Sequence, residues 1–368
     1  MYISMSYQRL ANSTRQEIFV YLRETLWRQK EGVSSSLSGK QACSLLQEAE
    51  KQAVSGLVID ALIRNDVRIP HEILFNSIGL QEQIKHSNLK LNEGVKLLHQ
   101  LFSNNNVSYV VVKGQVVASY YPDPLIRQSG DVDYYCNNDN FPKSLKAIEE
   151  AWIINPDIEE SSIHIHFEKD SVIYEGHYSL ALLYNKKKDA YWQKILDEDM
   201  GATVDIGGAK VATLTPTIHA LYIFLHLYRH LMELGVGLRQ FCDWAIILHY
   251  CKDCIDHHKL QQHLKVLGLE KAYRACGSIL VDYLGLPQKE FGYTITDKDR
   301  SYGSKVLDVV FYRGNMGHFN KRHGYVGLKH KLEAVGIKVS HFVKFMPLAP
   351  GFSCNWLWYG LSKKTFRV

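Results

Sequence analysis

Two acidic residues separated by one position, Asp131 and Asp133, are the feature of this sequence that most directly suggests chemistry. Successive side chains of a β-strand point to opposite faces, so a strand here would place the two carboxylates side by side. Without a cation such a pair repels, and a divalent metal is its simplest partner. Because Mg²⁺ favours one or two carboxylates together with substrate phosphates and water, the pair predicts a phosphate-handling metal site.

An Asp-x-Asp pair also occurs on exposed strand edges and in turns, and the neighbouring residues decide between these interpretations. Gly130 directly precedes the pair and permits a close approach of the backbone, while Val132 would point into an apolar core. Upstream, the apolar run 107–112 ends in Lys113-Gly114. This context favours a site built where two strands meet.

Two basic residues near this pair, Lys113 and Arg127, are candidates for contacts with a triphosphate. The guanidinium of arginine is a rigid fork that matches phosphate oxygens, whereas a lysine ammonium acts as a point charge. A solvated surface position is the alternative for any single basic residue. Their position beside a glycine turn and a carboxylate pair favours the phosphate contact.

Two spacings on expected helices carry weaker signals. His226 and His230 lie one helical turn apart but lack the intervening Glu of a metalloprotease helix, so we expect them to be packed or to line a groove. Arg239 and Asp243 have the i,i+4 spacing of an ion pair along a helix, and we expect that pair to be structural.

The elements that must position these residues follow from the hydrophobic pattern. Apolar residues three and four apart predict helices within 16–64 and over 82–104. Helical spacing returns after Thr215-Pro216, a favourable helix start, and continues through most of the rest. Between these regions, β-branched, aromatic and alternating residues predict strands over 107–112, 131–136, 162–168 and 172–178, the last two forming a hairpin.

The composition is that of a folded protein, with 368 residues, 46% of them hydrophobic and 22% charged. The net charge of +5 comes without a long Lys/Arg block, which makes long nucleic acid a poor candidate partner. The N-terminus does not resemble a signal peptide, and no run approaches the ~20 apolar residues of a membrane-spanning helix. We therefore expect a soluble cytoplasmic protein without a membrane partner.

The cysteines agree with a reducing compartment. Seven of them are scattered along the chain, which argues against a disulfide framework. Cys251-x-x-Cys254 followed by His257-His258 has the residue types of a zinc site, but the compressed spacing near an expected helix end favours coincidence.

Taken together, these motifs resemble the nucleotidyltransferases of the DNA polymerase beta superfamily, and within it an uncharacterised bacterial group. The resemblance covers roughly residues 91–180 and, more loosely, the helical segments that contain 237–239 and 243–244. The shared segments are Val112-Lys113-Gly114, Tyr121 to Pro124, Arg127 to Asp133, and Tyr174 to His177.

In that superfamily a glycine-containing turn lies near the nucleotide phosphates, two acids on the next strand hold Mg²⁺, and a third acid on a following strand completes the site. The resemblance implies that Asp131, Asp133 and Glu175 are the catalytic metal ligands for two Mg²⁺ ions. The nucleotide-binding residues expected beside them are Lys113, Gly114, Arg127, Ser129, Gly130 and His177.

The third acid is the position with an alternative. Glu175 shares one strand face with His177, and the resemblance places the acid there. Glu168, on the other hairpin strand with His164 and His166, is the second candidate.

The sequence thus predicts an α+β protein whose small mixed sheet of nucleotidyltransferase type is flanked by helical regions. We expect a helical N-terminal region (1–90), a nucleotidyltransferase-type domain (91–214) and a mostly helical C-terminal domain (215–368). The expected reaction is Mg²⁺-dependent transfer of an NMP group from an NTP to an acceptor hydroxyl or phosphate of a small molecule or a protein. Gln115 follows Gly114 where the superfamily commonly has Ser, which motivates a catalytically degenerate nucleotide-binding protein as the alternative.

Overall fold

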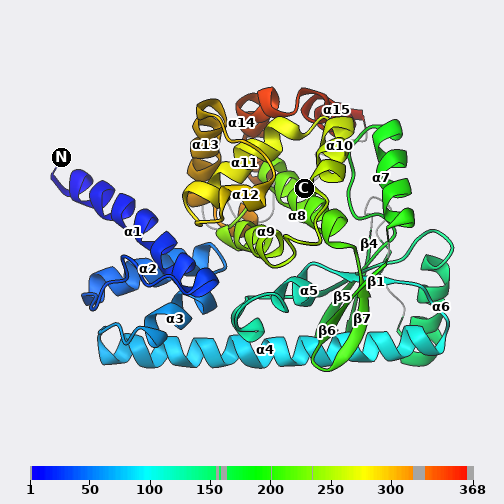
Figure 1. The fold of residues 1–368 in the computed structure, drawn as a ribbon, viewed down its shortest axis with the longest axis horizontal. Helices are drawn as coiled ribbons and strands as arrows, with labels where there is room; N and C mark the ends of the chain where they lie inside the picture. The colour runs from blue at the N-terminus through cyan, green and yellow to red at the C-terminus, as the bar shows by residue number, and fades with distance from the viewer. Residues whose placement is uncertain are drawn as a thin grey trace.

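The computed structural model describes residues 2–154, 157–158, 164–199, 201–233, 235–317 and 328–362. It confirms the expected α+β class: one mixed sheet lies between a long helix on one side and a large group of helices on the other (Figure 1). None of the helices in these ranges combines the length and apolar character that crossing a membrane requires.

The sheet has seven strands in the described ranges, in the spatial order β3-β4-β5-β2-β1-β7-β6. β2 runs parallel to β5 and β1 parallel to β7, while the other neighbours are antiparallel. The strands are β1 (Val110–Val112), β2 (Val132–Tyr135), β3 (Asp157–Ile158), β4 (His164–Lys169), β5 (Val172–His177), β6 (Ala202–Ile206) and β7 (Ala209–Thr213).

Two hairpins of this sheet, β4–β5 and β6–β7, each turn through two residues in the left-handed conformation. Asp170 and Ser171 connect β4 to β5, which confirms the predicted hairpin; the first two residues of the predicted strand 162–168 lie outside the described residues. Gly207 and Gly208 connect β6 to β7, a hairpin that the hydrophobic pattern did not predict. Two-residue turns of this kind match the twist of antiparallel strands and so fix their register.

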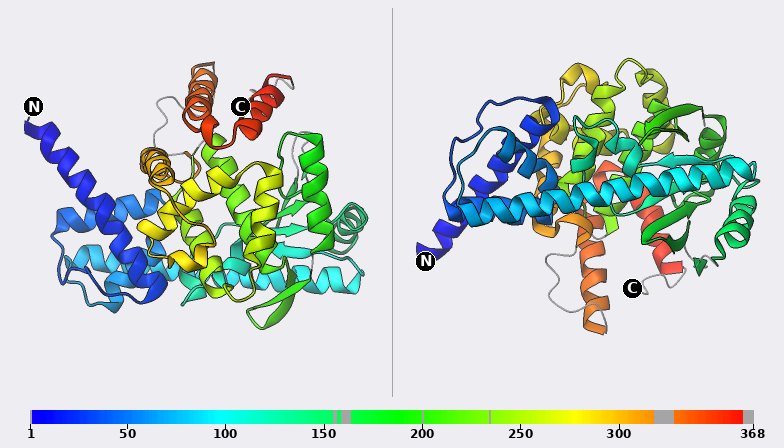
Figure 2. Two further views of the ribbon diagram at one scale, coloured as in Figure 1. Left: turned by 45° about the horizontal axis from the view of Figure 1, so that its top comes forward. Right: turned by 90° about the horizontal axis from the view of Figure 1, so that it is seen from below.

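One helix, α4 (His71–Asn104), extends under the whole molecule as a single 34-residue rod (Figures 1 and 2). It begins before the predicted start at residue 82 and passes through the predicted domain boundary at residue 90. On its inner face Asn88 donates from Nδ2 to the carbonyl oxygens of Leu125 and Arg127, each at 2.7 Å. Six residues later, the Gly94 carbonyl accepts from the Tyr174 hydroxyl at 3.1 Å.

The remaining helices lie before, between and after the strands in sequence. Three form the N-terminal group: α1 (Tyr2–Trp27), α2 (Gly39–Lys51) and α3 (Ser55–Arg64). Three lie between strands: α5 (Gly114–Ala118), α6 (Phe141–Trp152) and α7 (Lys186–Glu198). The C-terminal group comprises α8 (Pro216–Glu233), α9 (Leu238–Tyr250), α10 (His257–Leu267), α11 (Glu270–Asp282), α12 (Gln288–Phe291), α13 (Asp297–Arg313), α14 (Leu328–Phe345) and α15 (Pro350–Ser362).

The two faces of the sheet pack against different hydrophobic clusters. In β1, Val111 belongs to the cluster that faces α4 and α6, while Val110 and Val112 belong to the cluster that faces the C-terminal helices. In β2, Tyr134 and Tyr135 divide in the same way. Because side chains alternate along a strand, Asp133 shares its face with Tyr135 and is directed toward the C-terminal helices.

The N-terminal helices also support the segment that precedes β2. Ser55 at the start of α3 donates its backbone N–H to the Gln128 side-chain oxygen at 2.6 Å. Gly56 lies so close to this segment that a Cβ atom would be 2.1 Å from the Ile126 carbonyl oxygen. α3 therefore contacts the backbone that leads into the acidic pair.

We predict that Gly56→Ala lowers the free energy of unfolding by about 1–3 kcal/mol, because the added methyl group can be accommodated only if backbone shifts. Gly79→Ala in α4 is the matched control: nothing lies within 4 Å of its added Cβ, and replacing an exposed helical glycine should stabilise by about 0.5–1 kcal/mol. Urea unfolding measures both. Equal effects of the two substitutions would contradict the close contact.

Candidate functional site

Strand register brings the second acid of the pair next to the predicted third acid. Asp133 lies opposite Val112 of β1 on one side and opposite Glu175 of β5 on the other. Residues directly opposite one another on neighbouring strands project from the same face. Asp133 and Glu175 are therefore adjacent carboxylates on the face that looks toward α8.

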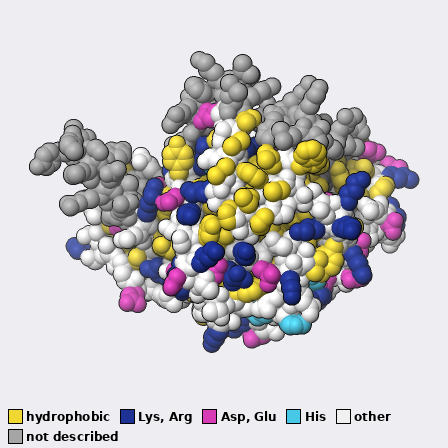
Figure 3. Space-filling model, turned by 90° about the horizontal axis from the view of Figure 1, so that it is seen from above, with side chains coloured by type: hydrophobic (Ala, Val, Ile, Leu, Met, Phe, Trp, Pro, Cys, Tyr) yellow, Lys and Arg dark blue, Asp and Glu magenta, His cyan; other side chains and the backbone are white. Residues whose placement is uncertain are grey.

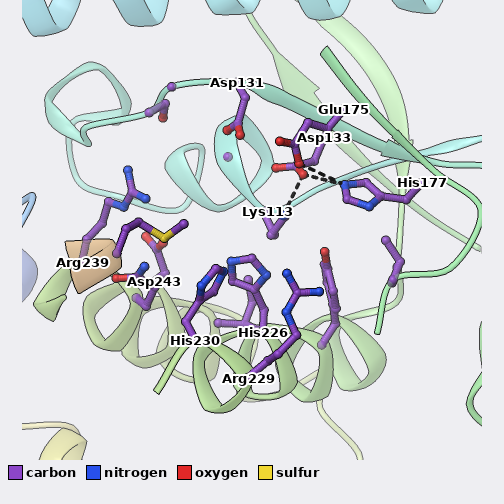
Figure 4. Close-up of a pocket in the computed structure, with 18 of the residues that line it drawn as sticks. Lys113, Asp131, Asp133, Glu175, His177, His226, Arg229, His230, Arg239 and Asp243 are labelled. Atoms are coloured by element: carbon purple, nitrogen blue, oxygen red, sulfur yellow. Dashed lines mark hydrogen bonds and ion pairs between the residues drawn. The ribbon is translucent and has the colours of Figure 1, made fainter. Parts of the chain in front are cut away.

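All nine predicted site residues line one cavity of about 370 Å³ between this face and the helices α8 and α9. The acids lie on one wall, and His226, Arg229, His230 and Arg239 approach from the other (Figure 4). The lining residues outside the predicted nine are His164, Leu180, Tyr222, Ile223, His226, Arg229, His230, Arg239, Gln240, Asp243 and Met316. The structure thus gathers the predicted residues in one place, while their roles stay predictions.

Asp133 has two partners within the protein. Its Oδ1 lies 2.7 Å from the Lys113 ammonium and 2.8 Å from Nε2 of His177. Burial by itself would raise the pKa of Asp133, but Lys113 and His177 outweigh it and hold that pKa well below its usual range. Lys113 is therefore the counter-charge that keeps Asp133 ionised.

The backbone at Lys113 is unusual and accounts for the direction of its side chain. Its φ is 53° and its ψ −136°, a conformation that residues with a Cβ rarely adopt, and its N–H donates to Nε2 of His219 at 3.3 Å. Next to it, Gly114 has a φ of +26°, and an added Cβ there would be 3.3 Å from the Asp131 carbonyl oxygen. The turn after β1 is thus held against the acidic pair.

The other two acids carry raised pKa values. Burial, followed by the charge of Asp133, raises the pKa of Glu175 to about 7. The charge of Asp133, followed by burial, raises the pKa of Asp131. Burial lowers the pKa of His177 to about 4, so its ring is neutral and can donate its Nε2–H to Asp133. These shifts indicate a site that is short of positive charge around Asp131 and Glu175.

Ligand atoms of Asp133, Glu175 and His177 all lie within 4.8 Å of one another, which suits a single divalent cation. Among the described residues no other group of three His, Cys, Asp or Glu side chains does so. Asp131 lies outside this group but lines the same cavity. The donor set therefore fits a metal bound by Asp133 and Glu175, with Asp131 nearby.

Arg127, a candidate for contact with the triphosphate, has an ion-pair partner within the protein. Its Nε and Nη2 each lie 2.7 Å from one carboxylate oxygen of Asp243 in α9, and its Nη1 lies 2.6 Å from the Ser129 hydroxyl. The Tyr121 hydroxyl adds a third hydrogen bond to Asp243, at 2.8 Å. Arg127 and Asp243 are 5% and 4% exposed, so this fork joins two buried charges.

This pair also corrects the expected i,i+4 pairing of Arg239 with Asp243. Asp243 pairs with Arg127, and Arg239 instead donates from Nη1 to the Gln128 carbonyl oxygen at 2.5 Å. Arg239 thereby lies beside the segment that carries Ser129 and Gly130.

The structure distinguishes among the other candidate residues, because some line the cavity and others do not. Glu168, the alternative third acid, is exposed opposite Ile173 and does not line the cavity. His226 and His230 do line it, with ring centroids 4.4 Å apart, as expected for groove-lining residues. The Cys251-x-x-Cys254 pattern forms no metal-binding group within the described ranges, and all seven cysteines are free.

The sequence analysis missed six of the lining residues, namely Leu180, Tyr222, Ile223, Arg229, Gln240 and Met316, and two of them are important for the site. Arg229 on α8 carried a signal, since it lies between His226 and His230 on an otherwise apolar helix. No sequence signal pointed to Met316, because its position in the cavity depends on a turn that no local sequence pattern predicts.

The site thus combines Asp131 directly before β2, Asp133 on β2 and Glu175 on the parallel neighbour β5 with a helical wall that supplies arginines. Residues 38–285 match the family described as uncharacterised nucleotidyltransferase, and the chain belongs to that family. No curated protein matches the chain significantly. Among solved structures it is similar to an antigenic nucleotidyltransferase-like protein from Paracoccidioides brasiliensis, at 14% identity and a TM-score of 0.34, over 53% of this chain and 92% of that one.

We predict that Asp243→Asn lowers the free energy of unfolding by about 3–5 kcal/mol, because it leaves the Arg127 guanidinium buried without a counter-charge. Glu198→Gln is the control: its pair with Lys194 is largely exposed, with the two side chains 65% and 70% accessible, and its loss should change stability only slightly. Urea unfolding of both variants checks this. If Asp243→Asn lowers the free energy of unfolding as little as the control does, the buried ion pair does not stabilise the fold.

Proposed function

We propose that this protein transfers an NMP group from an NTP to an acceptor hydroxyl or phosphate, with Mg²⁺ and with release of pyrophosphate. The observation that carries the proposal is the meeting, across one cavity, of three acids and two arginines. Asp133 and Glu175 lie on the sheet and Asp131 directly before β2, while the arginines lie on the helical wall. Membership of the nucleotidyltransferase family supports the reaction class.

The carboxylates of the cavity support the proposed metal-binding roles. Asp133 and Glu175 would hold one Mg²⁺, and Asp131 would join Asp133 in holding a second. Bound Mg²⁺ would neutralise phosphate charge and favour ionisation of the acceptor oxygen. His177 would position Asp133 through its 2.8 Å hydrogen bond rather than bind nucleotide directly, since its Nε2 is already engaged.

Three basic residues are suited to the phosphates. Arg239 lies beside the Gln128–Gly130 segment, and burial together with the nearby Arg127 lowers its pKa, so an anionic ligand would be favourable there. Arg229 lies on α8 with its Nε 3.7 Å from Glu233. Lys113 would move its ammonium from Asp133 to a phosphate oxygen, and Arg127 would hold the segment in place through Asp243.

The bond changes are those of a single displacement. The acceptor oxygen forms a bond to the α-phosphorus, while the bond from that phosphorus to the β-bridging oxygen breaks and pyrophosphate leaves with the electron pair. An acceptor hydroxyl gives its proton to solvent, whereas a phosphate acceptor is already ionised. The protein contributes positioning and charge rather than a covalent intermediate.

A small molecule or a protein side chain is the proposed kind of acceptor. The net charge is only +5, and on the face seen from above Lys and Arg side chains are interspersed with hydrophobic and acidic ones (Figure 3). Long nucleic acid is usually bound by a continuous basic track.

The test measures nucleotide binding with and without Mg²⁺, by thermal shift and calorimetry with ATP, GTP, CTP and UTP. The wild type should bind at least one of them only when Mg²⁺ is present. Asp131→Asn should abolish this binding. Glu175→Gln should retain binding but stop transfer of label from an NTP to components of a metabolite extract, while Glu168→Gln, the exposed control, should behave as wild type.

A catalytically degenerate nucleotide-binding protein is the alternative function. Gln115 favours it, since this residue is buried and donates to Asn92 at 2.6 Å, and it offers no hydroxyl to a phosphate. Nucleotide binding that persists without Mg²⁺ and in Asp131→Asn would support the alternative and contradict the enzyme. No response to any nucleotide would contradict both.

Lys113 provides a separate prediction, because its ammonium is the present counter-charge of Asp133. Lys113→Met should bind Mn²⁺ alone at least about tenfold more tightly than the wild type, since the cation no longer competes with the ammonium. It should bind Mg·ATP more weakly, because a phosphate contact is lost. Mn²⁺ titration followed by electron paramagnetic resonance measures the change in Mn²⁺ affinity, with Lys194→Met at an exposed position as the control. An unchanged Mn²⁺ affinity in Lys113→Met would show that the Lys113 ammonium does not compete with the metal for Asp133.

A further inference from the structure

The cavity wall contains one residue in a strained backbone conformation that the proposed chemistry does not use. Met316 lines the cavity and has a φ of 56° and a ψ of 14°, the left-handed region. Gly314 and Gly317 on either side also have positive φ, at 67° and 68°. The turn thus has glycine at two left-handed positions and a long side chain at the third, where such a residue is disfavoured by about 1 kcal/mol or more.

Several contacts hold this turn in place. The Gly317 N–H donates to the Gly314 carbonyl oxygen at 3.2 Å, and Gln240 donates from Nε2 to the Asn315 side chain, also at 3.2 Å. Gly237 lies so close that an added Cβ would be 3.1 Å from the Asn315 Cβ. The surrounding structure therefore fixes the conformation that directs Met316 toward the cavity.

The groups around Met316 limit what it can contact. Gln240 accepts from the Gly237 N–H at 3.2 Å and donates to Asn315, so its amide is already engaged at both ends. Its neighbour Arg239 presents a flat guanidinium beside the Gln128–Gly130 segment. A polarizable thioether and a guanidinium plane are suited to the faces of a flat aromatic ring rather than to its hydrogen-bonding edge.

We infer that Met316 contacts the base of the bound nucleotide and that this contact contributes to nucleotide affinity. The inference rests on the proposed function, since it places the triphosphate beside Arg239 and the acids and the base toward Met316. Such a contact with the ring face does not read the identity of the base.

The experiment compares Mg·ATP with Mg·tripolyphosphate, which has the phosphates but no base, by calorimetry. Met316→Ala should weaken Mg·ATP about tenfold, the equivalent of 1.4 kcal/mol, and change Mg·tripolyphosphate less than twofold. Met316→Leu should restore most of the ATP affinity. Met316→Gly should lose the same affinity as Met316→Ala but melt at a higher temperature, because glycine relieves the left-handed strain.

The outcomes separate this inference from the proposed function. If Asp131→Asn abolishes binding of both ligands but Met316→Ala binds Mg·ATP as the wild type does, or weakens both ligands equally, the base contact is refuted and the proposed function stands. If the wild type binds neither Mg·tripolyphosphate nor the Mg²⁺ complex of any of the four NTPs, or Asp131→Asn binds both ligands normally, the proposed function itself fails.

Discussion

The buried fork between Arg127 and Asp243 is the interaction on which the geometry of the cavity depends. It joins the segment before β2 to α9, and so connects the sheet wall to the helical wall. Two opposite charges removed from water are tolerated only while they remain paired and hydrogen-bonded. The two walls therefore cannot move apart locally without leaving one of these charges exposed or unpaired. The buried pair thus sets the spacing between the acids and Arg239.

Charge balance explains how so many ionised groups can share one small cavity. Its acids are Asp131, Asp133, Glu175 and Asp243, and its permanently charged bases are Lys113, Arg127, Arg229 and Arg239. The two sets are equal in number, so the cavity is neutral when all four acids are ionised, and it gains positive charge when Glu175, whose pKa is raised to about 7, takes up a proton. An NTP with four negative charges and two divalent cations also sums to zero, so binding both together would leave this balance unchanged.

The sequence was informative wherever a local period determined the outcome. Alternation along β2 and the two-residue turn at Asp170-Ser171 placed Glu175, and not Glu168, beside Asp133. The hydrophobic pattern did not predict the hairpin β6–β7, although Gly207-Gly208 is a typical hairpin turn, because its strands are short and half exposed.

Sequence reasoning failed where a contact spans the chain. Asp243 lies 116 residues from Arg127, and the local spacing to Arg239 offered a competing partner that the folded chain does not use. The strained turn at Met316 depends on Gly237 and Gln240, which belong to a different helix boundary. Such pairings are decided by tertiary packing, which no local pattern encodes.

The rod-like α4 has a consequence for how this chain can change in evolution. Asn88 supports the segment before β2, and Gly94 accepts the hydroxyl of Tyr174 from β5. Each residue added to an α-helix turns everything beyond it by about 100°. A single insertion between these two positions would rotate one contact away from the sheet while leaving the other in place. α4 can therefore lengthen or shorten at its ends, but the phase of its middle is fixed by the two strands that hold Asp133 and Glu175.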